Sequence, residues 1–454
     1  MNLRIEEYIR PGRRAHLVGI GGVSMSPLGE VLHGNGVVIS GSDMNESPTV
    51  EHLRSLGIPV TIGHLPQSVE GADCVIRTAA VHDDNPEIAA AFRLGIPVFE
   101  RAQAWGAIMT HYKNALCVAG THGKTTTTSM CTHIFLSAGL DPTVMIGGVL
   151  PVMGAGHRVG EGETIILESC EYCNSFLSFF PTVAVILNVD ADHLDFFKDL
   201  EDVKASFRKF AQLVPENGAV VADGDDENTM DALRGIDRPM ITFGLDRGDV
   251  HAANIVWHNG YAGFDVIYKG EKYAHVELSV PGEHNVRNAL AAAAAAIELK
   301  VPARAVEDGL NAFHGAGRRF ERKGEVNGAV VYDDYAHHPH ELKALFSAVK
   351  DLGYKRVICA FQPHTYSRTK ELFEDFVQEL RAPDKTLVAE IFAARETDTL
   401  GISSKDVAQR IPGAEYCATL ADVTARLREL AQPGDLILTV GAGDIFRAGE
   451  ELVK

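Results

Sequence analysis

Residues 114–128 read NALCVAGTHGKTTTT, and this stretch decides the fold. The apolar run 114–119 predicts a buried strand, Gly120 and Gly123 predict a turn, and the residues from Lys124 onward predict a helix. A strand that leads through a glycine-bearing turn into a helix begins a unit of parallel sheet, and it leaves backbone N–H groups at the helix N-terminus. The stretch therefore predicts an α/β fold with a phosphate-binding loop.

The loop 120–127 has the parts that a nucleotide requires. Lys124 suits the terminal phosphates, and the hydroxyl of Thr125 suits magnesium. The usual G-x-x-x-x-G-K-[ST] spacing would place a glycine where this chain has Val118, so the loop is a shortened form, and a simple glycine turn is the alternative. A phosphate loop also permits a kinase, a GTPase or a ligase. The candidate ATP contacts of the loop are Gly120, Thr121, His122, Gly123, Lys124, Thr125 and Thr126.

Two side chains further along the chain are candidates for the metal that accompanies the nucleotide. Glu168 ends one apolar run, and His193 follows another. Open parallel sheets bind ligands beyond the carboxyl ends of their strands, and Mg²⁺ prefers carboxylate oxygen. We predict that Thr125, Glu168 and His193 bind Mg²⁺, with Mn²⁺ as a substitute. The predicted catalytic residues are Lys124, Glu168 and His193.

Three segments repeat the order of apolar run, glycine turn and helix, which predicts three domains. At 454 residues the chain exceeds the roughly 100 to 200 residues of one domain. We place a Rossmann-like domain at 1–105, a central P-loop ATPase-like domain at 106–315 and a second Rossmann-like domain at 316–454. The central domain should contain a parallel sheet, and the alternation in 250–280 should add a small antiparallel sheet.

The first segment carries an incomplete dinucleotide fingerprint. Gly19 and Gly21 have its spacing, but Ser24 occupies the place of the third glycine. Asp43 provides the acidic residue expected about 20 positions further on. An NAD site, a site for another nucleotide diphosphate and a mere tight turn are all compatible with this pattern.

The third segment has two polar motifs where predicted strands stop. They are YDDYAHHP at 332–339 and FQPHTYSRT at 361–369. The adjacent His337 and His338 would point to opposite faces of an extended chain, which favours substrate contacts over a shared metal.

Composition narrows the class of protein. Asp and Glu outnumber Lys and Arg by 61 to 42 without any basic run, which argues against nucleic-acid binding. No window reaches the roughly 18 apolar residues of a membrane span, so no membrane insertion is expected. The N-terminus lacks the apolar core of a signal peptide, and the seven cysteines, including the isolated Cys170-x-x-Cys173, suit free thiols. We expect a cytoplasmic protein.

Eight motifs, in order, resemble those of the Mur ligases of bacterial cell-wall synthesis. The resemblance covers nearly the whole chain and all three segments, and it is closest to the member that adds L-alanine. The motifs are HLVGIGGVSMSPLGEVL with SGSD, AGTHGKTTTT, LESCEY, NVDADHLD, PGEHNVRNALAA, GRRFE, DDYAHHP and FQPHTYSRT.

The resemblance implies a role for each domain. The first would bind the UDP part of UDP-N-acetylmuramate, the second ATP, and the third L-alanine. The residues implied by motif are Gly21, Gly22, Ser42 and Asp43 for UDP; His284, Asn285, Arg319 and Asp334 for ATP; and Tyr335, His337 and Arg368 for L-alanine. Many relatives carry arginine where this chain has Thr365, which leaves Arg368 as the stronger candidate for the carboxylate of the amino acid.

The implied activity is that of an ATP-dependent ligase. It would join L-alanine to the lactyl carboxylate of UDP-N-acetylmuramate through an acyl phosphate and release ADP and phosphate. A monomer or a weak homodimer is expected. The alternatives are a family member that attaches a tripeptide to the same sugar, an NAD-dependent oxidoreductase, and a nucleotide-binding regulator without turnover.

Overall fold

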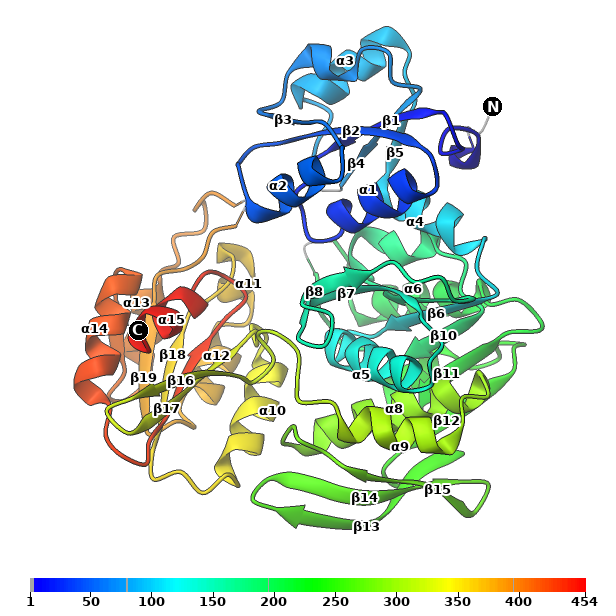
Figure 1. Ribbon diagram of the computed structural model, residues 1–454. Helices are drawn as coiled ribbons and strands as arrows, with labels where there is room; N and C mark the ends of the chain where they lie inside the picture. Colours follow the sequence, from blue (N-terminus) through cyan, green and yellow to red (C-terminus); the bar gives the residue numbers. More distant parts are fainter. Residues whose placement is uncertain (1–3, 79–80, 195, 395) are drawn as a thin grey trace. The chain divides into compact units, whose positions relative to one another are not determined.

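The computed structural model describes residues 4–78, 81–194, 196–394 and 396–454. Within these residues the chain forms three sheets flanked by helices (Figure 1), which confirms the α/β class. Contacts between residues divide the chain into two compact units, Met1–His251 with Leu290–Gly309, and Ala252–Ala289 with Leu310–Lys454. The domain boundaries near 105 and 315 remain a prediction.

The first sheet is parallel, with the strand order β3-β2-β1-β4-β5 in the described residues. Its strands are β1 (Arg14–Val18), β2 (Val38–Asp43), β3 (Val60–Ile62), β4 (Cys74–Arg77) and β5 (Val98–Glu100). The helical segments are η1 (Ile5–Glu7), α1 (Met25–Gly34), α2 (Pro48–Ser55), η2 (Pro66–Val69), α3 (Pro86–Leu94) and α4 (Arg101–Met109). The strand order reverses beside β1, which is where such sheets bind ligands.

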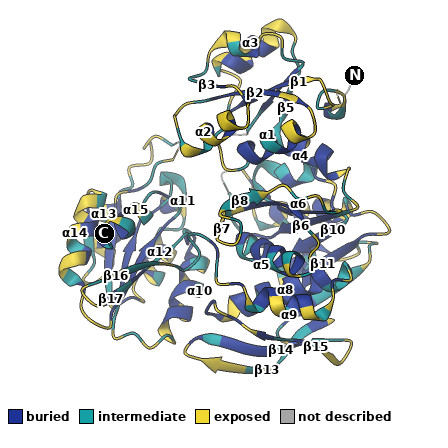
Figure 2. Cartoon of the chain, in the orientation of Figure 1, coloured by how far each residue is buried: buried dark blue, intermediate teal, exposed yellow. Residues whose placement is uncertain are grey.

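The second sheet contains the predicted parallel strands in its middle. Among the described residues its order is β15-β14-β13-β12-β11-β10-β6-β9-β7-β8. The strands are β6 (Asn114–Ala119), β7 (Thr143–Leu150), β8 (Ala155–Arg158), β9 (Thr164–Glu168), β10 (Val183–Ile186), β11 (Ala219–Asp223), β12 (Met240–Gly244), β13 (Val250–His258), β14 (Tyr261–Tyr268) and β15 (Glu271–Glu277). Figure 2 shows the central strands β6, β10 and β11 buried.

Two features of this sheet differ from the prediction. The alternating segment does form antiparallel strands, with β14 opposite β15, which confirms that part of the prediction. These strands do not form a separate sheet, because β13 begins in parallel pairing with β12, Phe243 opposite Val250 and Gly244 opposite His251. The antiparallel hairpin β7–β8 was not predicted. Its second strand, AGHR, has no apolar alternation from which a strand could be recognised.

The helix after the glycine loop is rich in threonine, a residue of low helix propensity. The helical segments around this sheet are α5 (Lys124–Ser137), η3 (Tyr172–Ser178), α6 (Leu200–Gln212), α7 (Glu227–Ala232), α8 (Glu283–Glu298) and α9 (Ala303–Asn311). In α5 the hydroxyls of Thr128, Ser129 and Thr132 each donate to the carbonyl four residues earlier, at 2.8 Å. These bonds satisfy the hydroxyls, so the helix can be buried against the sheet.

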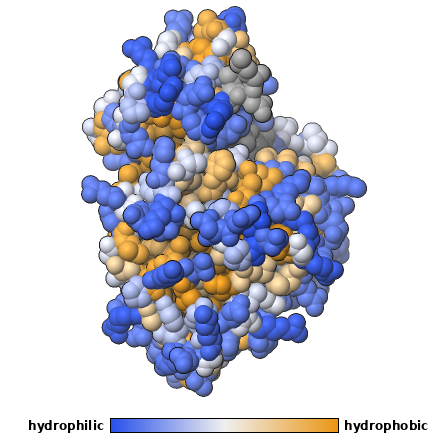
Figure 3. Space-filling view, turned by 90° about the vertical axis from the view of Figure 1, so that its right-hand side faces the viewer, coloured by the Kyte–Doolittle hydropathy of each residue, from blue (hydrophilic) through white to orange (hydrophobic). Residues whose placement is uncertain are grey.

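Helix α8 contains an apolar run, mainly alanine, at residues 289–296. All eight of these residues are fully buried. In the described part of the chain, no helix is both long and apolar enough to span a membrane. On the face in Figure 3, hydrophilic residues are spread widely and hydrophobic residues form patches between them.

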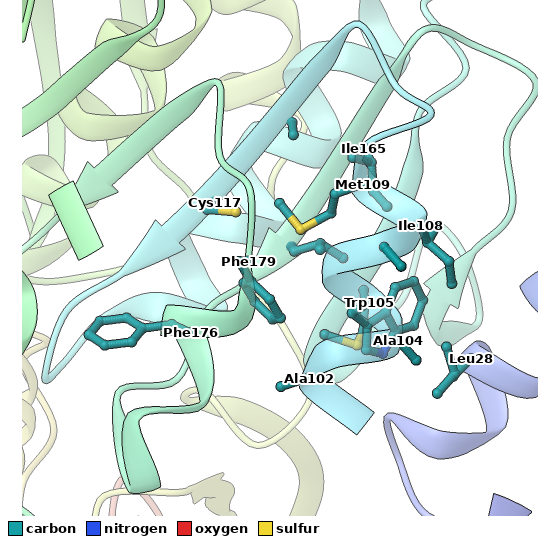
Figure 4. Close-up of a cluster of buried hydrophobic side chains, with 14 of the residues drawn as sticks. Leu28, Ala102, Ala104, Trp105, Ile108, Met109, Cys117, Ile165, Phe176 and Phe179 are labelled. Atoms are coloured by element: carbon teal, nitrogen blue, oxygen red, sulfur yellow. The ribbon is translucent and has the colours of Figure 1, made fainter. Parts of the chain in front are cut away.

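Helix α4 connects the first two sheets within the first compact unit. Figure 4 shows Trp105 of α4 in one buried cluster with Leu28 of α1 and Phe179, which follows η3. A Cβ at Gly106 would lie 2.0 Å from the carbonyl oxygen of Ser178, so only glycine permits this close contact between α4 and η3.

The third sheet has the order β16-β17-β21-β18-β19-β20 in the described residues. Its strands are β16 (Glu321–Val326), β17 (Ala329–Asp334), β18 (Val357–Phe361), β19 (Lys385–Ala389), β20 (Glu415–Cys417) and β21 (Leu436–Val440). The helices are α10 (Pro339–Lys350), α11 (Tyr366–Glu371), α12 (Phe373–Glu379), α13 (Ser404–Arg410), α14 (Leu420–Leu430) and α15 (Phe446–Leu452). Segment 366–379 is not one continuous helix, because Leu372 leaves helical geometry at φ −101°, ψ 26° and separates α11 from α12.

Candidate active site

The phosphate loop is a tight turn between β6 and α5. Gly120 has φ +149°, and a Cβ there would lie 2.8 Å from the Cβ of Leu187, so the turn requires glycine. Gly123 has φ +83° and precedes the first residue of α5. Val118, at the position where the usual loop has glycine, is fully buried in β6 and pairs with Glu168 of β9. The loop is shorter because the strand continues to Ala119.

Asn188, which follows β10, holds the loop in place. Its side-chain oxygen accepts a hydrogen bond from the backbone N–H of His122 at 2.8 Å, and its side-chain nitrogen donates to the His122 carbonyl at 3.1 Å. Its carbonyl accepts from the N–H of Thr121 at 3.1 Å. Asn188 begins the motif NVDADHLD, but its role could not be predicted from the sequence.

The ammonium group of Lys124 lies within the loop and is held by three acceptors. It donates to the carbonyls of Gly120 at 2.6 Å and Thr121 at 3.0 Å, and to the carboxylate of Glu171 at 3.1 Å. Burial alone would lower the pKa of Lys124, but the negative charge of Glu171 outweighs it and the pKa is raised. Lys124 is therefore a fixed positive charge at the phosphate site. Glu171 lies in LESCEY, but no spacing rule singled it out.

Glu168 and Thr125 share a hydrogen bond at the end of β9. The hydroxyl of Thr125 donates to Oε1 of Glu168 at 3.0 Å, and the N–H of Gly147 donates to Oε2 at 2.6 Å. A Cβ at Gly147 would lie 2.7 Å from Oε1 of Glu168, so Gly147 provides the space for this carboxylate. A hydroxyl and a carboxylate at this distance form a donor pair that fits Mg²⁺.

His193 lies close to the same group of side chains. Its Nε2 is 3.9 Å from Oε1 of Glu171, and its ring lies 4.7 Å from the ring of Tyr172. His193 has φ +54°, a left-handed conformation that is unfavourable for a non-glycine residue and that occurs often at functional sites. The structure thus brings the predicted residues Lys124, Thr125, Glu168 and His193 together, with Glu171 between Lys124 and His193.

A second group of predicted residues lies at the carboxyl ends of β1 and β2. The N–H of Gly21 donates to Oδ2 of Asp43 at 2.9 Å, and a Cβ at Gly21 would lie 2.9 Å from the same oxygen. The N–H groups of Gly19 and Ile20 donate to the carbonyl of Ser42 at 2.8 and 2.9 Å. These bonds hold the glycine turn, including Gly22, against the end of β2.

Beneath this turn lies a buried network around Glu87, the second residue of α3. The hydroxyl of Ser42 donates to Oε2 of Glu87 at 2.5 Å, and Nδ1 of His64 lies 3.0 Å from the same oxygen. Nε2 of His16 lies 3.4 Å from Oε1. Burial would raise the pKa of Glu87, but hydrogen bonds from His16, Ser42 and His64 hold it below its ordinary value. Glu87 and His64 could not be predicted from the sequence, because each lies in a different connection between strands.

The other predicted residues belong to the second compact unit. Asn285 lies in the first turn of α8, where its side-chain nitrogen donates to the carbonyl of Pro281 at 2.7 Å, and His284 is exposed. The Asp334 carboxylate accepts hydrogen bonds from the N–H groups of Phe320 and Ala336, both at 2.8 Å. Burial raises the pKa of Asp334 to about 6, against the opposing charge of Arg319.

Tyr335, His337 and Arg368 follow two strands of the third sheet that both pair with β21. The guanidinium of Arg319 lies 4.7 Å from the centre of the Tyr335 ring, a cation–π distance. Nδ1 of His337 donates to the Tyr335 carbonyl at 3.0 Å, so Nε2 is the basic nitrogen of the neutral ring. The ring of His337 lies 5.9 Å from that of His364, which accepts a hydrogen bond from Arg368 at 3.3 Å.

Thr365, three residues before Arg368, has a structural role in this protein. It precedes α11 with φ +67°, and its hydroxyl accepts from the N–H of Arg368 at 3.5 Å as the helix cap. The threonine thus orients the turn that presents Arg368.

Family models match the chain along nearly all of its length. The Mur ligase family catalytic domain matches residues 14–113, the Mur ligase middle domain residues 118–296, and the Mur ligase glutamate ligase domain residues 318–443. All three matches agree with the resemblance drawn from the motifs.

Relatives of full length are also similar. The UDP-N-acetylmuramate–L-alanine ligase of Clostridium novyi is 46% identical over 446 residues, 97% of each chain. The ligase of the same name from Caldanaerobacter subterraneus is 45% identical over 460 residues, 100% of this chain and 99% of its own. The solved UDP-N-acetylmuramate–alanine ligase of Thermotoga maritima has a TM-score of 0.82 at 29% identity and covers 97% of this chain and 98% of its own. Because relatives of this name are 45% and 46% identical over nearly the whole chain, the chain belongs to the Mur ligase family.

Proposed function

We propose that this protein is an ATP-dependent ligase that joins L-alanine to the lactyl carboxylate of UDP-N-acetylmuramate and releases ADP and phosphate. The observation that carries the proposal is the grouping of Lys124, Thr125 and Glu168 around a glycine loop at the carboxyl edge of a parallel sheet. Relatives at 46% and 45% identity over their full length carry the name of this activity.

The first step must activate the carboxylate, which is a poor electrophile. Its oxygen attacks the γ-phosphorus of ATP, the bond to the bridging oxygen of ADP breaks, and an acyl phosphate forms. The transferring phosphoryl group carries negative charge, which the ammonium of Lys124 stabilises from the loop. The backbone N–H groups at the start of α5 add positive potential at the same place.

Thr125, Glu168 and His193 are the residues that would hold Mg²⁺, with Mn²⁺ as a substitute. The Thr125 hydroxyl and the Glu168 carboxylate oxygen are 3.0 Å apart, a separation that would suit two ligands of one ion. The ion would neutralise charge on the β- and γ-phosphates. Gly147 keeps the carboxylate at this position by donating its N–H to Glu168.

In the second step the amine of alanine attacks the carbonyl carbon, the bond to phosphate breaks, and the amine loses a proton. Arg368 suits the carboxylate of alanine. Tyr335 and His337 follow β17, Arg368 follows β18, and both strands pair with β21. The rings of Tyr335 and His337 contact each other. His337 would accept the proton, since an imidazole can act as a base near neutral pH.

The test measures phosphate release from ATP in the presence of UDP-N-acetylmuramate and Mg²⁺. Separate reactions receive L-alanine, glycine, L-serine or the cell-wall tripeptide. We expect the highest kcat/KM with L-alanine, and Lys124→Ala should abolish release while UDP-sugar binding is kept. Turnover that depends on the tripeptide and not on alanine would identify the other ligase, and NAD reduction without phosphate release would identify an oxidoreductase.

We further propose that the enzyme works in the cytoplasm, as a monomer or a weak homodimer. All seven cysteines are free, and five of them are buried, which suits a reducing compartment. Light scattering at two protein concentrations would test the oligomeric state.

A further inference from the structure

Arg101, the first residue of α4, reaches across to the beginning of α1. Its Nη1 donates a hydrogen bond to the hydroxyl of Ser24, the residue that precedes α1. Trp105, one turn later in α4, donates from its ring nitrogen to the carbonyl of Ser24 at 3.3 Å. Both bonds lie within the first compact unit, so α4 fixes the guanidinium beside the glycine turn of the first sheet.

Arg101 forms no ion pair with the described residues. None of their carboxylates lies within 4 Å of its guanidinium, and the hydrogen bond to Ser24 uses one of its five N–H donors. The neighbouring Glu100 is committed to Arg77 at 2.9 Å. Burial lowers the pKa of Arg101 and outweighs the opposing attraction of the nearby Cys170 and Glu100. In a chain with 61 acidic and 42 basic residues, this isolation does not come from a shortage of carboxylates.

The place that Arg101 reaches also favours negative charge. Within the part of the chain that the structure describes, no side chain caps the N-terminus of α1, a helix of ten residues. The N–H groups of Met25 and Ser26 both turn to the carbonyl of Gly22, which closes the turn tightly. The positive end of the helix and the guanidinium therefore act on the same small region.

We propose that Arg101 binds an oxyanion of the UDP-sugar at the N-terminal turn of α1. The proposal rests on the proposed function, and it adds a residue that no motif in the sequence singled out. The sugar nucleotide offers two groups of this chemistry, the diphosphate and the lactyl carboxylate. Either would supply the acceptors that the guanidinium lacks in the free protein.

The first measurement separates a ligand-binding role from a structural one. An arginine that holds the fold together destabilises the protein when it is replaced. An arginine without an ion-pair partner does not, because Arg101→Met removes a partly buried charge and keeps most of the packing volume. We expect the melting temperature of the free R101M protein to equal or exceed that of the wild type. A clear loss of thermal stability would overturn the proposal.

The second measurement is calorimetric binding of UDP and of UDP-N-acetylmuramate. R101M should weaken binding by about 10- to 100-fold, the range for the loss of a hydrogen bond to a charged group, and R101K should recover part of it. Weaker binding of both ligands assigns Arg101 to the diphosphate, and weaker binding of the UDP-sugar alone assigns it to the lactyl carboxylate. Unchanged binding of both would overturn the proposal.

The matched control is Arg13→Met. Arg13 precedes β1, so it lies at the amino ends of the strands and not at the carboxyl ends where the glycine turn lies. It pairs with Asp73 at 2.9 Å. We expect R13M to leave both affinities unchanged. Binding does not require turnover, so wild-type protein that binds UDP-N-acetylmuramate but makes no product would refute the proposed function and leave the inference about Arg101 standing.

Discussion

Replacing Glu171 with glutamine should destabilise the free protein and tighten its binding of nucleotide. The ammonium of Lys124 has three N–H donors, and Gly120, Thr121 and Glu171 accept all three. A nucleotide phosphate can contact Lys124 only by replacing one of these acceptors. The two carbonyls belong to the loop itself, whereas the Glu171 carboxylate carries the same sign of charge as the phosphate. Glu171 is therefore the partner that the phosphate replaces.

The magnitude follows from the geometry. Lys124 and Glu171 are 14% and 2% exposed, and the charged atoms are 3.1 Å apart. At this distance the gross attraction is about 5 kcal/mol for an effective dielectric constant of about 20. The net contribution of a hydrogen bond between charged groups is about 1.5 to 3 kcal/mol, and glutamine keeps one acceptor oxygen. We expect the free energy of unfolding to fall by about 1.5 kcal/mol and the affinity for ADP to rise about tenfold.

Chemical denaturation of the free protein measures the free energy of unfolding, and calorimetric titration with Mg²⁺–ADP measures the affinity for ADP. Glu163→Gln is a matched control, because Glu163 pairs with Lys113 at 3.0 Å, but both side chains are more than 70% exposed. Exposed pairs contribute about 0 to 1 kcal/mol, so E163Q should leave stability and affinity nearly unchanged. If E171Q instead weakens ADP binding without loss of stability, then Glu171 orients Lys124 toward the phosphate, and its displacement by the phosphate is refuted.

Further predictions concern the other groups of the site. Gly147→Ala should reduce phosphate release more than tenfold by displacing Glu168, whose Oε1 lies 2.7 Å from the added methyl, while UDP binding is kept; normal activity would contradict this role. Glu87→Gln should raise the KM for the UDP-sugar about tenfold and leave the KM for ATP unchanged, and equal effects on both would indicate a structural role. Because the pKa of Glu87 is lowered from 4.5, its stabilising effect is present above that pH and is lost as the pH falls through the lowered value, so E87Q should lose less stability on acidification. Arg368→Met should raise the KM for L-alanine without changing UDP binding, as enzyme assay and calorimetry would show.

The order of residue types along the chain was sufficient to predict the strand, the glycine turn and the helix at 114–136. Apolar runs, glycines and the lysine each have a local physical meaning, so β6, the loop and α5 were predicted almost to the residue. The same holds for Glu168 and His193, which follow apolar runs and therefore lie at one edge of a parallel sheet. The hairpin β7–β8 and the break at Leu372 were not predicted, because neither follows from periodicity.

The sequence by itself determined the α/β class, the phosphate loop and the residues that its motifs carry. The tertiary structure alone decided which side chains support them. Asn188 holds the loop, Glu171 holds Lys124, Glu87 holds Ser42, and Arg101 lies beside Ser24. These partners lie far apart in the chain, from 45 positions between Ser42 and Glu87 to 77 between Ser24 and Arg101. Strand order and helix packing bring them together, and a contact of this kind leaves no periodic pattern in the chain.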